Sequence, residues 1–214
     1  MMMPPPVLLP AVLVTALSFA AGTAVAAPES ATQPALRGSA AEQGAVGDPT
    51  EWGPYGVGVA KLVFQDPSRG GREVVTEVWY PARTSGDAPG ELYYHLGWGQ
   101  ATRDAAPITD EAFPLVAFSH GNGGIRFQSI FYCEHLASHG YVVAAPDHLG
   151  NTFVDYDDDL TARAPIDRPL DISFVIDQLL DLSDAGLDPV PGTLNPAQIG
   201  VTGHSFGGYT SLVV

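Results

Sequence analysis

Hydrophobic residues in the second half of the chain form short apolar runs that alternate with helical patterns. Residues 113–118, 141–145 and 199–202 are almost wholly apolar, as expected for strands buried on both faces of a parallel sheet. Apolar residues recur at helical spacing over about residues 125–138, and again after Pro169, where a helix can start. This strand–helix–strand–helix–strand order predicts an α/β fold with a doubly wound, mostly parallel sheet.

Two β-rich runs precede this region and predict an antiparallel hairpin. Residues 57–64 and 74–80 are rich in β-branched and aromatic side chains, and the turn-forming residues 66–71 separate them. We expect this hairpin at one edge of the sheet. The polar stretch 84–111 follows, and its aromatic patch at residues 93–98 favours a packed loop over a ligand site.

The N-terminus has most features of an export signal. Residues 1–27 carry no charge, and the apolar run 7–20 is short for a membrane span, which needs about 20 residues. Ala24-Val25-Ala26 fits the small-x-small pattern that signal peptidase reads, although no Lys or Arg precedes the run. We expect a cleaved signal peptide at residues 1–26, a flexible lead-in at 27–51 and one domain at 52–214. The protein would then be secreted, with no stable membrane insertion after cleavage.

Composition narrows the range of partners. The 214 residues are 45% hydrophobic, enough for one domain with a core, and carry a net charge of −15. Such a surface repels nucleic acid and anionic lipid, so no nucleic-acid partner is expected. The carboxylates at residues 157–159 could bind calcium, but they lack the alternating ligands of a calcium loop and favour a solvated acidic face. Cys133 is the single cysteine, and the helical pattern places it in the core.

A candidate nucleophile lies at the end of the chain. Residues 203–207 read Gly-His-Ser-Phe-Gly, directly after the apolar run 199–202 and at the start of a predicted helix at 206–212. This is the strand–turn–helix context that the Gly-x-Ser-x-Gly motif requires. The two glycines leave room for a sharp, strained turn, and the helix N-terminus favours developing negative charge. The pattern predicts Ser205 as the nucleophile of an acyl transfer; the alternative is a glycine-rich turn without chemistry.

A glycine-rich segment, residues 118–124, follows the first buried run. Its glycines allow backbone N–H groups to face a substrate oxygen, and acyl transfer needs two such donors for its oxyanion. One donor would be the N–H of Phe206, directly after the nucleophile, and the other an N–H of this segment. Phosphate binding is the weaker alternative, because the segment lacks the Lys-Ser/Thr ending of a phosphate-binding loop.

The sequence context of five of the six histidines predicts where their side chains lie. We expect His204 to point away from the nucleophile into the packing beside the turn, and His120 to hydrogen-bond the loop that follows it. His135 and His139 have the i, i+4 spacing of metal ligands, but no third ligand is evident, which favours exposed helix histidines. His148 follows a predicted strand at the sheet edge where α/β proteins bind ligands, so it is the one histidine expected to line a site.

Several segments together support a family resemblance. They are residues 77–81, 118–126, 136–146, 168–171 and 203–208, which occur in this order. From about Trp52 onward the chain resembles the exported serine esterases related to platelet-activating-factor acetylhydrolase and the dienelactone-hydrolase-like proteins. Dienelactone hydrolases have cysteine as nucleophile, so a serine here favours esterases and lipases.

The resemblance has consequences for fold, site and substrate. It implies an α/β-hydrolase fold, Ser205 as nucleophile, and oxyanion donors at Phe206 and Asn122. The implied substrate is a small-molecule ester, with a short acyl group or a phospholipid-like structure. No metal or organic cofactor is implied.

The catalytic acid and histidine of this fold normally follow the nucleophile. Nine residues follow Ser205, and residues 209–214 contain neither type. We therefore expect the domain to be truncated after the nucleophile turn, with an exposed apolar edge at strand 199–202. Two functions stay open: a secreted carboxylic ester hydrolase, or a catalytically inactive fragment or binding-only domain.

Overall fold

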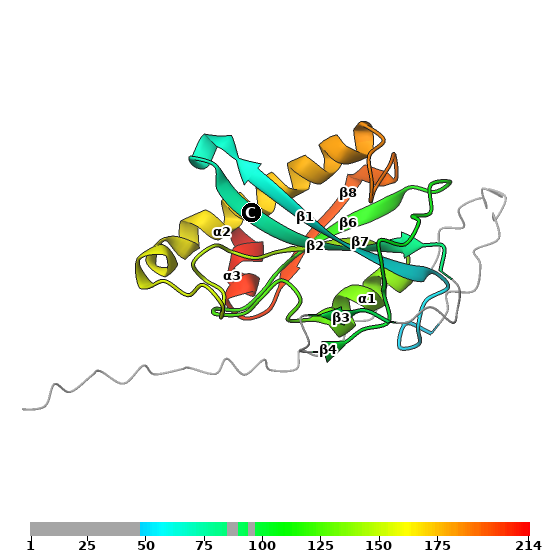
Figure 1. Cartoon of the computed structure of the whole chain (residues 1–214), viewed down its shortest axis with the longest axis horizontal. Coiled ribbons are helices and arrows are strands. Elements are labelled where there is room, and N and C mark those ends of the chain that lie inside the picture. The colour runs from blue at the N-terminus through cyan, green and yellow to red at the C-terminus, as the bar shows by residue number, and fades with distance from the viewer. Residues whose placement is uncertain (1–47, 85–89, 94–96) are drawn as a thin grey trace, which may run out of the picture. The chain divides into compact units, whose positions relative to one another are not determined.

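The computed structural model describes residues 48–84, 90–93 and 97–214 (Figure 1). The predicted signal peptide at 1–26 and most of the lead-in lie outside these residues. Six strands of the described chain form one sheet, in the order β5-β1-β2-β7-β6-β8. Strands β3 (Leu92–Tyr93) and β4 (Gly97–Trp98) form a separate antiparallel pair.

The predicted hairpin is confirmed. Strands β1 (Gly56–Asp66) and β2 (Arg72–Ala82) pair antiparallel along their whole length, joined by a 3-10 turn at Pro67–Arg69. The predicted edge position needs a correction. The short strand β5 (Thr102–Arg103), from the polar stretch, pairs in parallel with β1 and lies outside it.

The parallel part of the sheet matches the three predicted apolar runs. Strand β6 (Phe113–Ser119) lies between β7 (Val142–Pro146) and β8 (Leu194–Gly203) and is parallel to both. Strand β2 joins the hairpin to this part through an antiparallel pairing with β7. All residues of β7 are buried, as predicted for a strand covered on both faces.

Helices cover the two faces of this sheet (Figure 1). Helix α1 (Ile130–Ser138) buries Cys133 against one hydrophobic cluster, and α2 (Asp158–Asp184) buries Leu179 against another. Adjacent residues of β2 point to opposite faces, so Val78 belongs to the α2 cluster and Trp79 to the α1 cluster. Cys133 is therefore a core residue, as predicted.

Helix α2 starts earlier than the sequence pattern indicated. We expected a start at Pro169, but the side chain of Asp157 accepts a hydrogen bond from the Leu160 backbone and caps the helix there. Pro165 and Pro169 lie inside the helix. The helix ends at Asp184, and Gly186 takes a left-handed φ of 68° just after the last turn.

Helix α1 starts later than the pattern indicated, at Ile130 instead of about residue 125. The backbone N–H of Arg126 donates to the Asp147 carboxylate instead of forming part of a helix. Gly140 follows the helix with a φ of 89°, a left-handed conformation that glycine adopts readily at the end of a helix.

Candidate active site

The predicted nucleophile lies in a strained turn between β8 and helix α3 (Phe206–Val213). Ser205 connects the two with φ 54° and ψ −114°, and its side chain is exposed. A positive φ is uncommon for residues other than glycine and stores backbone strain, which recurs at functional sites. The structure therefore has the strand–turn–helix geometry that the motif predicted.

This turn contacts the end of strand β6. The N–H of His204 donates to the Ser119 carbonyl oxygen at 3.1 Å. A Cβ on Gly203 would lie 2.6 Å from that same oxygen, and a Cβ on Gly207 would overlap it. Glycine is required at both positions because the Ser119 carbonyl occupies the space beside the turn.

The glycine-rich loop at residues 120–124 lies next to the nucleophile turn. A Cβ on Gly121 would be 3.0 Å from Nδ1 of His204. Within the loop, the N–H of Gly121 donates to Gln128 Oε1, and the N–H of Gly124 donates to the Gly121 carbonyl oxygen. The two segments that the sequence singled out are thus brought together.

Three backbone N–H groups of these segments remain open for a ligand. Those of Asn122 and Gly123 donate to no atom in the part of the chain that the structure describes. Phe206 opens helix α3, so no residue within that helix can accept its N–H. An oxyanion requires donors of this kind, held in place before the reaction.

The segment after β7 holds the loop from its other side. The Asn151 side-chain nitrogen donates to Asn122 Oδ1 at 2.8 Å, and the N–H of Phe153 donates to the Gly124 carbonyl oxygen. A Cβ on Gly123 would lie 3.9 Å from the ring of Tyr156. The exposed ring of Tyr156 therefore borders the loop, and two more exposed apolar side chains, Phe153 and Val154, lie in the same segment.

A fully buried hydrogen-bond chain lies behind the loop. Arg168 donates to Ser119 Oγ at 3.0 Å, so the Ser119 hydroxyl proton is directed to Nε2 of His148, 2.9 Å away. Nδ1 of His148 then donates to Asp171 at 3.0 Å. Ser119, His148 and Asp171 are all 0% exposed. The prediction that His148 lines an accessible site is therefore wrong. The Ser119 hydroxyl is likewise closed to substrate.

Burial determines the charge states of this chain. Burial lowers the pKa of His148 to about 4, although the hydrogen bond to Asp171 opposes the shift. Burial also lowers the pKa of His120 to about 2. Burial alone would raise the pKa of Asp171, but hydrogen bonds from His148 and Arg72 hold it well below its usual range. At neutral pH both histidines are neutral and Asp171 is ionised.

The other histidines of the described residues form no hydrogen bond with the nucleophile. His120 donates through Nδ1 to the Gly121 carbonyl oxygen at 2.7 Å, as predicted. His135 and His139 are partly exposed and bond the carbonyl oxygens of Pro49 and Glu51. The side chain of His204 is exposed, so the prediction that it packs beside the turn is wrong.

The described residues contain neither a histidine base bonded to Ser205 nor a cluster suited to a metal ion. None of their histidines makes a hydrogen bond to the Ser205 hydroxyl. The described ranges also contain no group of three or more His, Cys, Asp or Glu side chains that could hold a metal ion.

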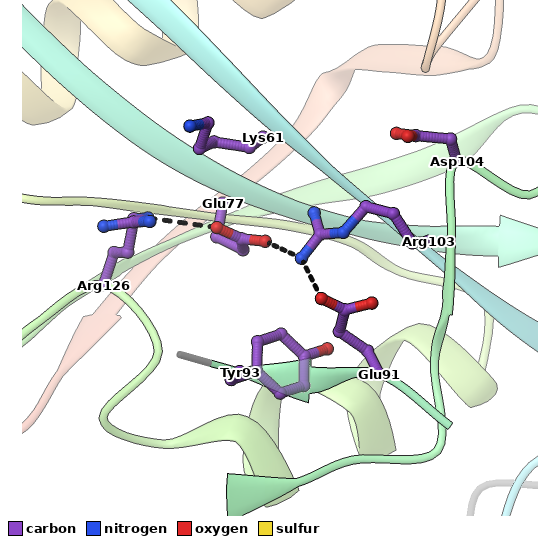
Figure 2. Close-up of a pocket in the computed structure, with 7 residues that line it drawn as sticks. All are labelled: Lys61, Glu77, Glu91, Tyr93, Arg103, Asp104 and Arg126. Carbon is purple, nitrogen blue, oxygen red and sulfur yellow. Dashed lines mark hydrogen bonds and ion pairs between the residues drawn. The ribbon is translucent and has the colours of Figure 1, made fainter. Parts of the chain in front are cut away.

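A charged cavity of about 540 Å³ lies near the far end of the loop (Figure 2). Arg103 bridges Glu77 and Glu91 there, with nitrogen–oxygen distances of 2.6 and 3.0 Å. Glu77 also pairs with Arg126 at 3.0 Å, and Arg126 reaches Asp147 at 2.5 Å. Since Arg126 closely follows the loop, these ion pairs tie the loop to β2 and to the end of β7.

The mostly parallel sheet and the serine in its strained turn define the α/β-hydrolase fold. The family model of platelet-activating factor acetylhydrolase, isoform II, matches residues 90–154, which include the loop but not Ser205. Platelet-activating factor acetylhydrolase of Canis lupus familiaris is 26% identical, over 75% of this chain and 50% of that protein. The chain therefore resembles the platelet-activating-factor-acetylhydrolase-like esterases, as the sequence motifs indicated.

A solved structure supports the same fold. The ferulic acid esterase from Streptomyces cinnamoneus superposes with a TM-score of 0.61 at 26% identity, over 75% of this chain and 55% of that one. The chain thus spans about half the length of the relatives that it matches.

Proposed function

We propose that the protein is a secreted serine hydrolase that cleaves carboxylic esters through an acyl-serine intermediate. The observation that carries this proposal is the strained turn that exposes Ser205 beside a loop with open N–H groups. Ser205 Oγ attacks the ester carbonyl carbon, and the N–H groups of Phe206 and Asn122 bind the oxyanion that forms. Collapse of the tetrahedral intermediate releases the alcohol, and water then hydrolyses the acyl-serine.

The attack needs a base, because a serine hydroxyl is a weak nucleophile by itself. None of the described histidines bonds to Ser205, and His120 and His148 are engaged in buried contacts. We therefore propose that the catalytic histidine and acid that serve Ser205 are not among the described residues.

The proposed substrate is a small ester with an apolar group, of short-acyl or phospholipid-like type. Two observations support this choice. The esterase relatives act on esters by name, and the exposed ring of Tyr156 borders the loop, with exposed Phe153 and Val154 in the same segment. The net charge of −15 disfavours nucleic acids and anionic lipid surfaces.

Hydrolysis of p-nitrophenyl acetate and butyrate tests the activity, with protein expressed from its complete open reading frame. Ser205→Ala should lower kcat by about a thousandfold or more, because removal of the nucleophile abolishes the acyl-enzyme route. Ser173→Ala, an exposed serine on α2, is the matched control and should keep full activity. Full activity in Ser205→Ala, or its loss on adding a chelator, would contradict the mechanism.

Export is the second part of the proposal and is supported by residues 1–26. Of the helices in the described residues, none combines the length and apolar character needed to cross a membrane. Mass spectrometry of the culture supernatant should find mature protein that begins at Ala27. An intact Met1 terminus, or protein confined to the cytosol, would reject the signal peptide.

The alternative is a chain of 214 residues that does not hydrolyse esters by itself. The lack of a hydrogen bond between Ser205 and any described histidine favours it for this chain. A fluorophosphonate probe distinguishes the two cases: the chain alone should label slowly at Ser205. Rapid stoichiometric labelling would mean that a base within these 214 residues serves Ser205.

A further inference from the structure

Arg168 is a buried cation that forms no ion pair with a carboxylate of the described residues. It lies on helix α2 and is 1% exposed. In the part of the chain that the structure describes, no carboxylate forms an ion pair with it, and its Nε has no hydrogen-bond partner. Burial lowers its pKa to about 10, so it stays charged at neutral pH. A buried guanidinium is stable only while its hydrogen bonds are in place, so these bonds constrain the groups that accept them.

One side of the Arg168 guanidinium holds the glycine-rich loop. Nη2 donates to the His120 carbonyl oxygen and to Ser119 Oγ, where the loop leaves strand β6. Nη1 donates to Asn151 Oδ1 at 2.8 Å. Asn151 in turn donates to Asn122 Oδ1, also at 2.8 Å. Arg168 thus reaches the first proposed oxyanion donor through a single intervening side chain.

The same guanidinium contacts the other proposed donor. Its central carbon lies 4.5 Å from the centre of the Phe206 ring, a cation–π arrangement. Phe206 opens helix α3 directly after Ser205, so its ring fixes the start of the helix whose N–H faces the substrate. Arg168 is therefore in contact with both halves of the proposed oxyanion hole.

We infer that Arg168 is the positioning residue of the oxyanion hole, holding the loop at Asn122 and the turn at Phe206 in one fixed relation. This inference rests on the proposed function for its catalytic meaning, but the positioning itself is a property of the fold. The planar guanidinium serves three acceptors and one ring at once, which a lysine cannot do. The helix α2 that carries it also carries Asp171, so the whole buried chain is anchored on one element.

Amide hydrogen exchange of the 214-residue chain tests the positioning without any need for activity. Arg168→Met should speed exchange, by about tenfold or more, at the hydrogen-bonded N–H groups beside both donors: that of Gly124 in the loop and that of Gly207 in the turn. Asn151→Ala should speed exchange at Gly124 alone, because it cuts only the link to the loop. Arg163→Met, an exposed arginine on the same helix, is the control and should change neither. Unchanged exchange at Gly124 or at Gly207 in Arg168→Met overturns the inference.

If Arg168→Met does not fold, Arg168→Lys provides the same readout, since lysine keeps the positive charge but lacks the planar guanidinium with its several donors. Faster exchange at both Gly124 and Gly207 then supports the inference, and unchanged exchange at either one overturns it.

Kinetics on the protein from its complete open reading frame test the catalytic consequence. Arg168→Met should lower kcat by roughly a hundredfold with KM nearly unchanged, as for the loss of an oxyanion donor. In Arg168→Ala, millimolar guanidinium ion should restore part of kcat, which a general loss of folding would not allow. A kcat equal to that of wild type overturns the inference. If wild type shows no Ser205-dependent hydrolysis, the proposed function fails instead, and the exchange experiment alone decides the role of Arg168.

Discussion

The hydroxyl oxygen of Ser119 lies 2.9 Å from Nε2 of His148, and both side chains are completely buried. With Asp171 on the other ring nitrogen, the three groups form the hydrogen-bond chain of a catalytic triad in a place that no substrate reaches. The exposed serine, Ser205, has no such partner among the described residues. The buried chain therefore stabilises the end of β6 and the loop, and its titration should be visible in the stability of the fold.

The first prediction concerns acid stability. The folded pKa of His148 is about 4, below the ordinary value of 6.5, so the unfolded chain binds more protons between these pH values. The free energy of unfolding should fall by about 1.4 kcal/mol per pH unit from His148 alone as pH drops from 6.5 toward 4. His120 adds to the same trend, since its folded pKa is also lowered.

His148→Gln separates the two contributions. Urea unfolding at pH 5, 6 and 7 should show a shallower loss of stability in this variant than in wild type. Arg168, Arg72 and Asp171 face the same ring and remain charged over this range, so they contribute little to the slope. Equal slopes in the two proteins would show that His148 does not titrate in this way.

The second prediction concerns the glycine after the nucleophile. A Cβ on Gly207 would overlap the carbonyl oxygen of Ser119, which belongs to a central strand and cannot move aside. Gly207→Ala should therefore destabilise the protein by about 1–3 kcal/mol, as overpacking does. The nearest atom to a Cβ on Gly208 lies 3.7 Å away. Gly208→Ala is the matched control and should be neutral or stabilising by up to about 1 kcal/mol, since alanine favours helix. Chemical denaturation compares them; equal stability of both variants would contradict the clash.

Local sequence signals predicted most of the fold. The apolar runs that became β6 and β7 are nearly continuous because both faces of these strands are covered. Strand β8 lies at the edge of the sheet and its apolar run is largely exposed, with Ile199 at 40%, as expected for the apolar edge at 199–202. The start of α2 was missed because a proline was read as the first residue of a helix. The stronger signal was Asp157, whose carboxylate caps the backbone of Leu160. Strand β5 pairs with β1 over only two residues, which is too short for a sequence pattern. Its position depends on the path that the preceding loop takes back to the sheet.

The nucleophile turn and the loop were predictable because glycine spacing reports directly on backbone crowding. The buried hydrogen-bond chain of Ser119, His148 and Asp171 was not predictable. His148, Arg168 and Asp171 were each visible in motifs, but their meeting depends on α2 lying across the end of β6. An arginine within a helical pattern is ordinarily read as surface, and nothing local marks Arg168 as 1% exposed.

The third prediction concerns the ion pairs around the charged cavity (Figure 2). The side chain of Glu77 is 2% exposed and pairs with both Arg103 and Arg126. Glu77→Ala should cost about 3 kcal/mol of unfolding free energy, because it removes one side of a buried pair. Glu91→Ala is the control: this residue is more exposed and its loss should cost less than about 1 kcal/mol. Denaturant titration measures both, and a Glu77→Ala loss as small as that of Glu91→Ala would show that the network is dispensable.

The last prediction concerns acyl-chain preference. The ring of Tyr156 borders Gly123 in the loop and is 49% exposed, so it offers apolar surface beside the proposed oxyanion hole. Burying each extra methylene of an acyl group contributes about 0.8 kcal/mol, a factor of roughly four in kcat/KM. Tyr156→Ala should therefore lower the ratio of kcat/KM for p-nitrophenyl butyrate to that for acetate, by severalfold. Phe131→Ala removes an even more exposed ring, on helix α1, and should leave this ratio unchanged. An unchanged ratio in Tyr156→Ala would place the acyl chain elsewhere, whereas a lowered ratio would assign the loop after β7 to substrate binding.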